Sequence, residues 1–423
     1  MDDRQRQMLH RFTTDVTRFT HEFVSSEADA ILGCESSDLI SHQSGATSAL
    51  GHASGDNGTK TAARSADTQA HPADPTTGEE RASIKSFIAP ALDLLNGGKH
   101  LRTLLVWAGY AAYTPVTDGA YTLLVHLGSA LELFHTSALI HDDVIDASPL
   151  RRGRPSAQVQ LAQLAQHHRW EKPQKFGTSA AIQLGDFMLS TAFSALADAS
   201  ALLPSNTTGS VMSIFSRMTA EVAYGQYLDI AAESEPLPPT DAHANQDQLG
   251  SATLHSAALQ RARQVIAHKS VSYSTAGPLD LGAAAAGATE EQREDLRRFS
   301  TPLGYAFQLR DDALGLFGDP QETGKSSSSD FQEGKRTALL MIARAHLSQP
   351  DVAWIDSHIG HPLSVEDQQH ASSLIYSAAF DEHEHMITRL EHRAIQELDT
   401  LNIRHQAADF LRELTHEMHH RTK

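Results

Sequence analysis

Apolar residues recur at intervals of three and four along most of this chain. Leu124, Leu127, Leu131, Phe134 and Ala138 form one such series. This spacing places apolar side chains on one face of a helix, whereas the strict alternation typical of half-buried strands is scarce. The pattern therefore predicts an all-α protein, a single-domain bundle of antiparallel helices.

Polar segments interrupt the helical pattern and suggest the organisation of the chain. Residues 35–80 are dominated by Ser, Gly, Ala, Thr and His, with few large apolar groups to offset the entropy lost on ordering. We expect a flexible low-complexity insertion there, between an N-terminal helix region at 1–34 and a helical domain at 81–423. Within that domain, residues 234–252 carry three prolines and predict a long loop.

Charge and composition exclude several classes of protein. The 423 residues include 34 Lys and Arg against 52 Asp and Glu, a formal net charge of −18. This charge disfavours nonspecific binding to nucleic acid or to an anionic membrane. Cys34 is the only cysteine, which rules out an intrachain disulfide and fits a cytoplasmic protein. No run of 18 apolar residues occurs, so we expect no membrane span.

Two pairs of adjacent aspartates each close an apolar helical segment, in DDVID at 142–146 and DDALG at 311–315. Asp142 and Asp146, four residues apart, share one helix face, and such carboxylates repel one another near an apolar core unless a cation lies between them. One motif alone is more often a solvated helix end paired with Arg151 and Arg152. Two motifs favour a site for Mg²⁺, which prefers oxygen ligands and shares its coordination with phosphates.

Short basic segments supply the cations that a diphosphate would need. They are GGKHLR at 97–102, RRGR at 151–154, HKS at 268–270, and TGK with EGKR between 323 and 336. Gly97 and Gly98 free backbone N–H groups to approach an anion at a helix start, and paired arginines suit bidentate phosphate binding. Each segment alone is more often ordinary surface. Together with two aspartate motifs they predict a diphosphate site.

The order of these motifs resembles the trans-isoprenyl diphosphate synthases, the polyprenyl synthetase family, and within it the geranylgeranyl diphosphate synthases. The resemblance covers residues 84 to 345 and rests on GGKHLR, LELFHTSALIHDDVIDASPLRRGRPS, LGDFMLSTAF, YGQYLDI, HKS, FQLRDDALGLFGDPQETGK and SDFQEGKRT. It implies helices around a deep central cavity and a homodimer. It also implies head-to-tail condensation of isopentenyl diphosphate with an allylic diphosphate.

The resemblance also implies residue roles. Three Mg²⁺ ions per active site would be held by Asp142, Asp146 and Asp311, supported by Asp143 and Asp312. Isopentenyl diphosphate would be bound by Lys99, Arg102, His135 and Arg152. The allylic diphosphate would be contacted by Arg151, Lys269, Ser270, Gln308, Lys325 and Lys335.

Four positions depart from the family pattern. Gly315 stands where many members have the last aspartate of DDxxD, so one supporting carboxylate is missing from the second motif. His100 and Thr103 replace the commoner Arg and Pro of GGKRLRP. Ser270 replaces the Thr of HKT and keeps its hydroxyl.

Product length depends, in this family, on bulky residues four and five positions before the first aspartate. Those positions are Ser137 and Ala138 here, which leave room beyond fifteen carbons. Phe134, one turn deeper, is a candidate floor, although a Phe there is as often plain core. We therefore expect geranylgeranyl diphosphate, of twenty carbons, with longer polyprenyl or farnesyl products as alternatives.

Three other functions share some of these features. A class I terpene cyclase would need no isopentenyl site and would carry an NxxxSxxxE motif, which is absent from the sequence. A noncatalytic synthase subunit usually lacks an aspartate motif, whereas both are retained here. A metal phosphohydrolase could use His141 and Asp142, but its other histidines do not fall in helical register with them.

Overall fold

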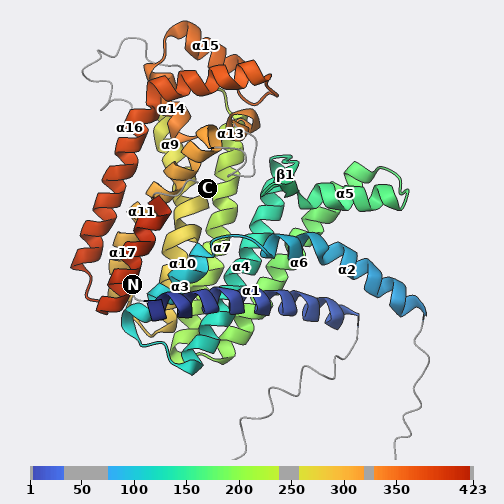
Figure 1. The fold of residues 1–423 in the computed structure, drawn as a ribbon, viewed down its shortest axis with the longest axis vertical. Helices are drawn as coiled ribbons and strands as arrows, with labels where there is room; N and C mark the ends of the chain where they lie inside the picture. Colours follow the sequence, from blue (N-terminus) through green and yellow to red (C-terminus); the bar gives the residue numbers. More distant parts are fainter. Residues whose placement is uncertain (1–2, 33–74, 238–256, 319–327, 420–423) are drawn as a thin grey trace, which may run out of the picture.

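The computed structural model describes residues 3–32, 75–237, 257–318 and 328–419, and helices account for nearly all of them (Figure 1). The strands found in these ranges are β1 (Leu150–Arg151) and β2 (Arg154–Pro155), which pair antiparallel directly after the first aspartate motif. The prediction of an all-α fold is confirmed.

The helices of the first half are α1 (Asp3–Ile31), α2 (Pro75–Leu95), α3 (Leu101–Tyr113), α4 (Asp118–Ile145), α5 (Ala157–His167), α6 (Pro173–Ala201) and α7 (Ser205–Ser234). Those of the second half are α9 (Ala257–Val265), the π-helix η3 (Ile266–Ala276), α10 (Gly277–Ala285), α11 (Glu290–Phe317), α13 (Ser329–Glu333), α14 (Ala338–His346), α15 (Gln349–His358), α16 (Val365–Thr400) and α17 (His405–His419).

Helix α4 is the central element because it is apolar on almost every side. Thr117 begins it, with its hydroxyl accepting a hydrogen bond from the backbone N–H of Ala120. Leu124, Leu127 and Leu131 are fully buried, and each contributes roughly 2 kcal/mol by leaving water. The helix packs along α6 and also contacts α1 and α3. Its last turn carries Asp142 to the edge of this core.

Helix α11 holds the second aspartate motif in a similar setting. A capping box at Thr289 begins the helix, and its apolar face packs mainly against α16 and η3. In Figure 1 the ends of α4 and α11 that carry the aspartates lie in the upper half of the view, near β1 and α13. Lys335 joins the two regions, because its ammonium lies 2.9 Å from Oδ2 of Asp146.

Several predicted boundaries differ from the structure. Helix α2 begins at Pro75, so residues 75–80, predicted as flexible insertion, are helical; proline is well suited to the first turn of a helix. Residues 33–74 lie outside the described ranges. Helix α13 is short and follows residues 319–327, which also lie outside the described ranges. Helix α7 ends at Ser234, where the predicted loop 234–252 begins, and residues 238–256 are not described.

Two helices, α4 and α6, are long and apolar enough to cross a membrane by length and composition. The most apolar window of α4 is 78% buried inside the bundle, whereas that of α6 is 44% buried. Neither helix contains 18 consecutive apolar residues, so the sequence criterion did not detect them. The burial of α4 explains its apolar character. Helix α6, in contrast, leaves part of its apolar surface exposed.

Candidate active site

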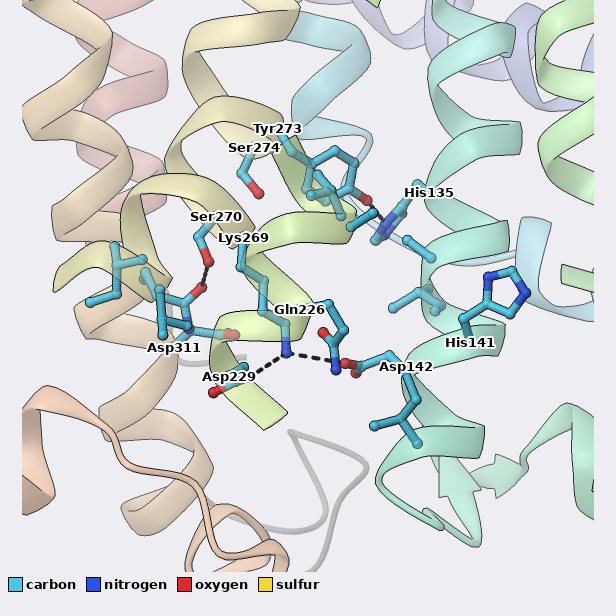
Figure 2. A pocket seen from close by; sticks show the side chains of 18 of the residues that line it. His135, His141, Asp142, Gln226, Asp229, Lys269, Ser270, Tyr273, Ser274 and Asp311 are labelled. Atoms are coloured by element: carbon cyan, nitrogen blue, oxygen red, sulfur yellow. Dashed lines mark hydrogen bonds and ion pairs between the residues drawn. The ribbon is translucent and has the colours of Figure 1, made fainter. Parts of the chain in front are cut away.

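A cavity of about 940 Å³ lies between α4, α6, α7, η3, α11 and the segment from α13 to α14. One part of it is polar and is lined by Asp142, Lys269 and Asp311, as Figure 2 shows. The other part is apolar and is lined by Phe134, Ala138, Leu189, Phe193, Ala220 and Ala223. The cavity therefore offers a charged region and a hydrocarbon region in one continuous space.

Carboxylates reach the polar region from three helices. Asp142 of α4 lies opposite Asp311 of α11, with Asp229 of α7 between them, and all three side chains point into the cavity (Figure 2). Asp312 also lines it. Within the described part of the chain, no three His, Cys, Asp or Glu residues come close enough to form a ready-made metal cage.

The remaining two acids of the first motif are not among the cavity-lining residues. Asp143 is fully buried and accepts a hydrogen bond from Nε of Arg151 at 2.8 Å. Asp146 lies 2.9 Å from the ammonium of Lys335. Burial and the neighbouring Asp142 raise the pKa of Asp146, although Lys335 acts in the opposite direction. Asp143 thus positions Arg151, and Asp146 positions Lys335.

Lys269 links two of the cavity carboxylates. Its ammonium lies 2.6 Å from Oδ2 of Asp229 and 3.2 Å from Oδ1 of Asp142, as the dashed lines in Figure 2 mark. Burial by itself lowers the pKa of Lys269, but these two carboxylates outweigh it and hold the pKa above its usual value. The lysine is therefore cationic at the centre of the polar region.

Negative charge remains in excess beside α11. Burial raises the pKa of Asp312 well above its usual range, the hydrogen bond from Gln308 lowers it, and Asp330, Asp311 and Asp229 raise it further. Gln308 in turn accepts a hydrogen bond of 2.6 Å from the hydroxyl of Ser270. A divalent cation is the simplest group that would relieve this crowding of carboxylates.

The π-helix η3 determines where Lys269 and Ser270 point. A π-helix, with hydrogen bonds from residue i to residue i+5, is rare and frequently occurs at functional sites. Gly225 of α7 packs directly on the backbone of Lys269, and a Cβ there would overlap the backbone nitrogen of Lys269. Glycine at 225 therefore allows η3 to approach α7, which places Lys269 within reach of Asp229.

A second cationic group lies one turn further along η3, beside Tyr273 and Ser274. Arg102 stacks over the ring of Tyr273 at 4.1 Å and donates a hydrogen bond to Oγ of Ser274 at 3.0 Å. Its Nη1 lies 3.4 Å from Nε2 of His135, whose Nδ1 meets the hydroxyl of Tyr273. Burial, followed by Arg102 and other nearby cations, lowers the pKa of His135 well below its usual value. The ring is neutral, with Nε2 accepting from Arg102 and Nδ1–H donating to Tyr273.

Arg152 is held against the loop that precedes α3. Its Nη1 donates to the carbonyls of Leu94 at 2.9 Å and Gly97 at 2.6 Å. Lys99 follows in this loop and is exposed. Neither Lys99 nor Arg152 is among the residues that line the cavity, whereas Arg102 and His135 are. The structure therefore places the four predicted isopentenyl-binding residues around one loop, with two of them facing the cavity.

The substitutions at 100 and 103 share one partner. Thr103 donates a hydrogen bond of 2.7 Å to Oε1 of Glu132, and Nδ1 of His100 lies 3.4 Å from Oε2 of the same carboxylate. Burial raises the pKa of Glu132, but the bonds from His100 and Thr103 outweigh it and lower that pKa overall. These two departures from the family pattern thus join the start of α3 to α4.

All but one of the remaining predicted residues line the cavity. Arg151, Ser270, Gln308 and Lys335 line the cavity, as do the predicted chain-length residues Phe134, Ser137 and Ala138. Ser137 also donates a hydrogen bond of 2.7 Å to the carbonyl of Gly185 on α6. Lys325 lies outside the described residues.

Sequence reasoning assigned no role to several residues that the structure places in the cavity. They are Gln226, Asp229, Tyr273, Ser274, Asp330 and Arg336. The motif YGQYLDI contains the first two, and its Gln and Asp, three residues apart on one helix face, were a usable signal. Tyr273 and Ser274 carried no such signal, because their direction depends on the π-helical turn.

These residues fit magnesium. Asp142 and Asp311 would hold it from opposite sides of the cavity, and both offer only oxygen atoms, the donors that Mg²⁺ prefers. The lack of a closed cage among the described residues agrees with an ion that completes its coordination with water and substrate phosphates. Cations for the phosphates, namely Lys269, Lys335 and Arg151, line the same space.

An all-α bundle whose central cavity joins a carboxylate-rich, cationic region to a hydrocarbon region defines an enzyme that acts on an isoprenoid diphosphate. The polyprenyl synthetase family model matches residues 85–375, and the chain belongs to that family. It is a trans-prenyltransferase that extends prenyl diphosphates head to tail, in a family that uses Mg²⁺. The predicted resemblance is confirmed.

Relatives in the family make products of different lengths. A geranylgeranyl diphosphate synthase of Sulfolobus acidocaldarius is 30% identical over 277 residues, which cover 63% of this chain and 72% of the relative. An all-trans-nonaprenyl-diphosphate synthase of Rhodobacter capsulatus is 28% identical and covers 72% of this chain and 80% of the relative.

The solved structures include a geranylgeranyl pyrophosphate synthase from Corynebacterium glutamicum, complexed with isoprenyl diphosphate and magnesium. It aligns with a TM-score of 0.72 at 32% identity and covers 80% of this chain and 91% of its own. The two chains therefore share the fold over most of their length.

Proposed function

We propose that this enzyme condenses isopentenyl diphosphate with an allylic diphosphate and releases all-trans geranylgeranyl diphosphate, a product of twenty carbons. The observation that carries the proposal is the aromatic end of the cavity. Phe134 lines that end, is only 5% exposed, and packs edge-on against Phe215 and Tyr273. Phe193 packs edge-on against Phe215 and lines the cavity beside it.

The space above this aromatic end is open because the nearer positions are small. Ser137 and Ala138 line the cavity one turn closer to Asp142 than Phe134 does. A helical turn rises 5.4 Å, which is about the length added by one isoprene unit. A floor at Phe134 in place of position 138 therefore lengthens the available tunnel by about one unit, from fifteen carbons to twenty.

In the proposed mechanism the allylic C–O bond breaks and its electron pair leaves with the diphosphate. Lys269, Lys335 and Arg151 stabilise this growing negative charge in a site with little water. Magnesium, which Asp142 and Asp311 would hold at three ions per site, would supply further neutralisation of the diphosphate. Arg102, His135, Lys99 and Arg152 orient isopentenyl diphosphate so that its double bond attacks the allylic cation. The proton lost from the adduct goes to the departing diphosphate.

The second cationic group distinguishes this reaction from terpene cyclisation. Arg102 and neutral His135 lie beside Tyr273 and Ser274, one turn of η3 beyond Lys269, and both line the cavity. A cyclase binds a single diphosphate and would leave this group without a ligand. Consumption of isopentenyl diphosphate by the purified protein separates the two reactions.

Product length should follow the residues of the tunnel. With Mg²⁺, isopentenyl diphosphate and farnesyl diphosphate, we expect the wild type to form a twenty-carbon diphosphate. Ala138→Phe should shift the product to fifteen carbons when the primer is dimethylallyl or geranyl diphosphate, because the new ring would fill the tunnel one turn above Phe134. Phe134→Ala should yield chains beyond twenty carbons. Mass spectrometry of the dephosphorylated prenols measures all three.

Ala82→Phe is the matched control for added bulk, because Ala82 is exposed on α2 and is not among the residues that line the cavity. Its product should remain at twenty carbons. A wild type that stops at fifteen carbons, or an Ala138→Phe variant with unchanged products, would contradict the proposed floor.

We also propose that the enzyme is a homodimer in the cytoplasm. Large apolar residues outside the cavity are exposed on α6 and α7, namely Ile182, Met212 and Tyr224, together with Leu202 at the end of α6. Exposed apolar surface of this kind usually marks an interface. Sedimentation velocity should give twice the mass of one chain for the wild type, and Ile182→Asp combined with Tyr224→Asp should shift it toward the monomer. A monomeric wild type would contradict the dimer, and cell fractionation tests the location.

A further inference from the structure

The turn between α5 and α6 carries an exposed aromatic ring among exposed cations. Residues 167–175 read HHRWEKPQK, and we call them the basic turn. Its cationic side chains are Arg169, Lys172 and Lys175, against a single acid, Glu171. All three cations are exposed, and none of them pairs with a carboxylate of the described residues. Trp170 lies between them and is 47% exposed.

The basic turn has a defined shape and a peripheral place. The backbone N–H of Trp170 donates to the carbonyl of Ala165 at 2.9 Å, which closes the end of α5. Arg169 and Lys172 have positive φ angles of 57° and 54°, and they reverse the chain before α6 begins. The indole packs edge-on against Phe176, with ring centroids 4.8 Å apart. In Figure 1 α5 lies at the side of the bundle away from α16.

This combination of side chains suits an anionic membrane surface. Tryptophan is enriched at the boundary between lipid and water, because its ring is apolar and its N–H can remain hydrated. Neighbouring cations attract the phosphates of anionic lipids, and each of them raises the affinity by roughly fivefold. The basic turn supplies both elements in one exposed and ordered segment.

The formal net charge of −18 does not prevent such a contact. At physiological ionic strength charges are screened beyond a Debye length of about 8 Å, so a membrane that touches the basic turn responds mainly to the charges nearby. The chemistry of the family also favours the contact. A polyprenyl product carries a hydrocarbon tail, which is more stable in lipid than in water.

We propose that the basic turn docks the enzyme reversibly on an anionic membrane, with Trp170 among the lipid headgroups and the three cations against lipid phosphates. The inference goes beyond the proposed function, because it concerns where the enzyme works and holds for any product length. It requires no membrane-spanning helix. One aromatic anchor and three cations predict weak binding that salt reverses.

Vesicle flotation tests the charges of the basic turn. Wild type should float with vesicles of equimolar phosphatidylcholine and phosphatidylglycerol, but not with pure phosphatidylcholine. Lys172→Gln combined with Lys175→Gln should weaken binding by at least about tenfold. The matched control is Arg389→Gln combined with Arg393→Gln, which removes the same charge from exposed positions on α16 and should bind as wild type does.

Tryptophan fluorescence tests the insertion of the ring. The emission of the wild type should shift to shorter wavelength when anionic vesicles are added, because Trp170 enters a less polar environment. Trp170→Ala should remove this shift and weaken vesicle binding by about fivefold. Tyr376→Ala is the control for loss of an exposed ring, since Tyr376 is 52% exposed on α16. It should keep both the shift and the affinity.

The basic turn does not line the cavity, so the variants at 170, 172 and 175 should keep the wild-type rate of prenyl transfer with substrates in solution. That rate verifies that they are folded, and it tests the proposed function separately from membrane binding.

Several outcomes would overturn the membrane assignment. They are a wild type that does not bind anionic vesicles, a double lysine variant that binds them as well as wild type, and an unchanged emission in bound wild type. Equal affinity of the wild type for polyuridylate would identify a general polyanion site instead. Loss of the dimer in the double lysine variant, measured by sedimentation velocity, would place the basic turn in an interface between copies.

Discussion

Asp142→Asn should lower kcat/KM for prenyl transfer by at least about 10³-fold, since loss of one carboxylate from a metal-held diphosphate removes roughly 4 kcal/mol of transition-state stabilisation. Asparagine keeps the shape of the side chain, so the effect reports charge. Asp142 has two functions in the structure, because it faces Asp311 across the cavity and contacts Lys269 at 3.2 Å. Incorporation of labelled isopentenyl diphosphate at saturating Mg²⁺ measures the loss.

Asp198→Asn is the control for this experiment. Asp198 is exposed on α6 and is not among the residues that line the cavity, so the variant should retain the wild-type rate. An Asp142→Asn enzyme that keeps more than a tenth of the wild-type kcat/KM would mean that the first motif does not carry the metals. In that case the basic residues alone would have to stabilise the leaving group.

Arg151→Met should destabilise the fold by about 3–5 kcal/mol, the usual cost of leaving one member of a buried ion pair without its partner. The side chain of Asp143 is only 1% exposed, and Nε of Arg151 lies 2.8 Å from its Oδ1. Methionine fills much of the space of arginine but cannot compensate this carboxylate. Urea unfolding, followed by circular dichroism, measures the free energy of unfolding.

Two further variants make this stability prediction specific. Asp143→Asn combined with Arg151→Met should recover a large part of the loss, because no uncompensated charge is then buried. Arg154→Met should change stability by less than about 1 kcal/mol, because Arg154 is 66% exposed and lies 3.8 Å from Asp93. Equal effects at 151 and 154 would show that Asp143 does not depend on Arg151.

The two predictions address different functions of one short segment. Residues 142–152 contain one carboxylate that faces the cavity, two that are buried beside a cation, and two arginines whose side chains point to different partners. Arg151 turns back to Asp143, while Arg152, with a positive φ of 52°, turns to the carbonyl of Gly97. The DDxxD–RR spacing therefore serves catalysis and folding together, and mutation can separate the two.

The departures from the family pattern are explained by contacts in the folded structure. Gly315 removes a carboxylate and creates the space that Asp330 occupies. His100 and Thr103 replace an arginine and a proline, and both contact Glu132, which is buried on α4. In each case the substitution is understood only together with a residue that is distant in the sequence.

The sequence by itself determined the helical class of the fold and the composition of the polar region. Helical periodicity is a local property, so the apolar series from Leu124 to Ala138 was sufficient to predict a buried α4, and the four-residue spacing of Asp142 and Asp146 followed from the same geometry. The order of the motifs was sufficient to predict the family.

Only the tertiary structure decided which of these residues meet. The contact of Lys269 with Asp229 depends on a π-helical turn in η3 and on the close approach allowed by Gly225, and that of Asp330 with α11 depends on how α13 packs. Such contacts depend on the angles and distances between helices, which many side chains across the core set together. A linear pattern of residue types records which face of a helix is apolar, but not the distance at which that face meets its neighbour.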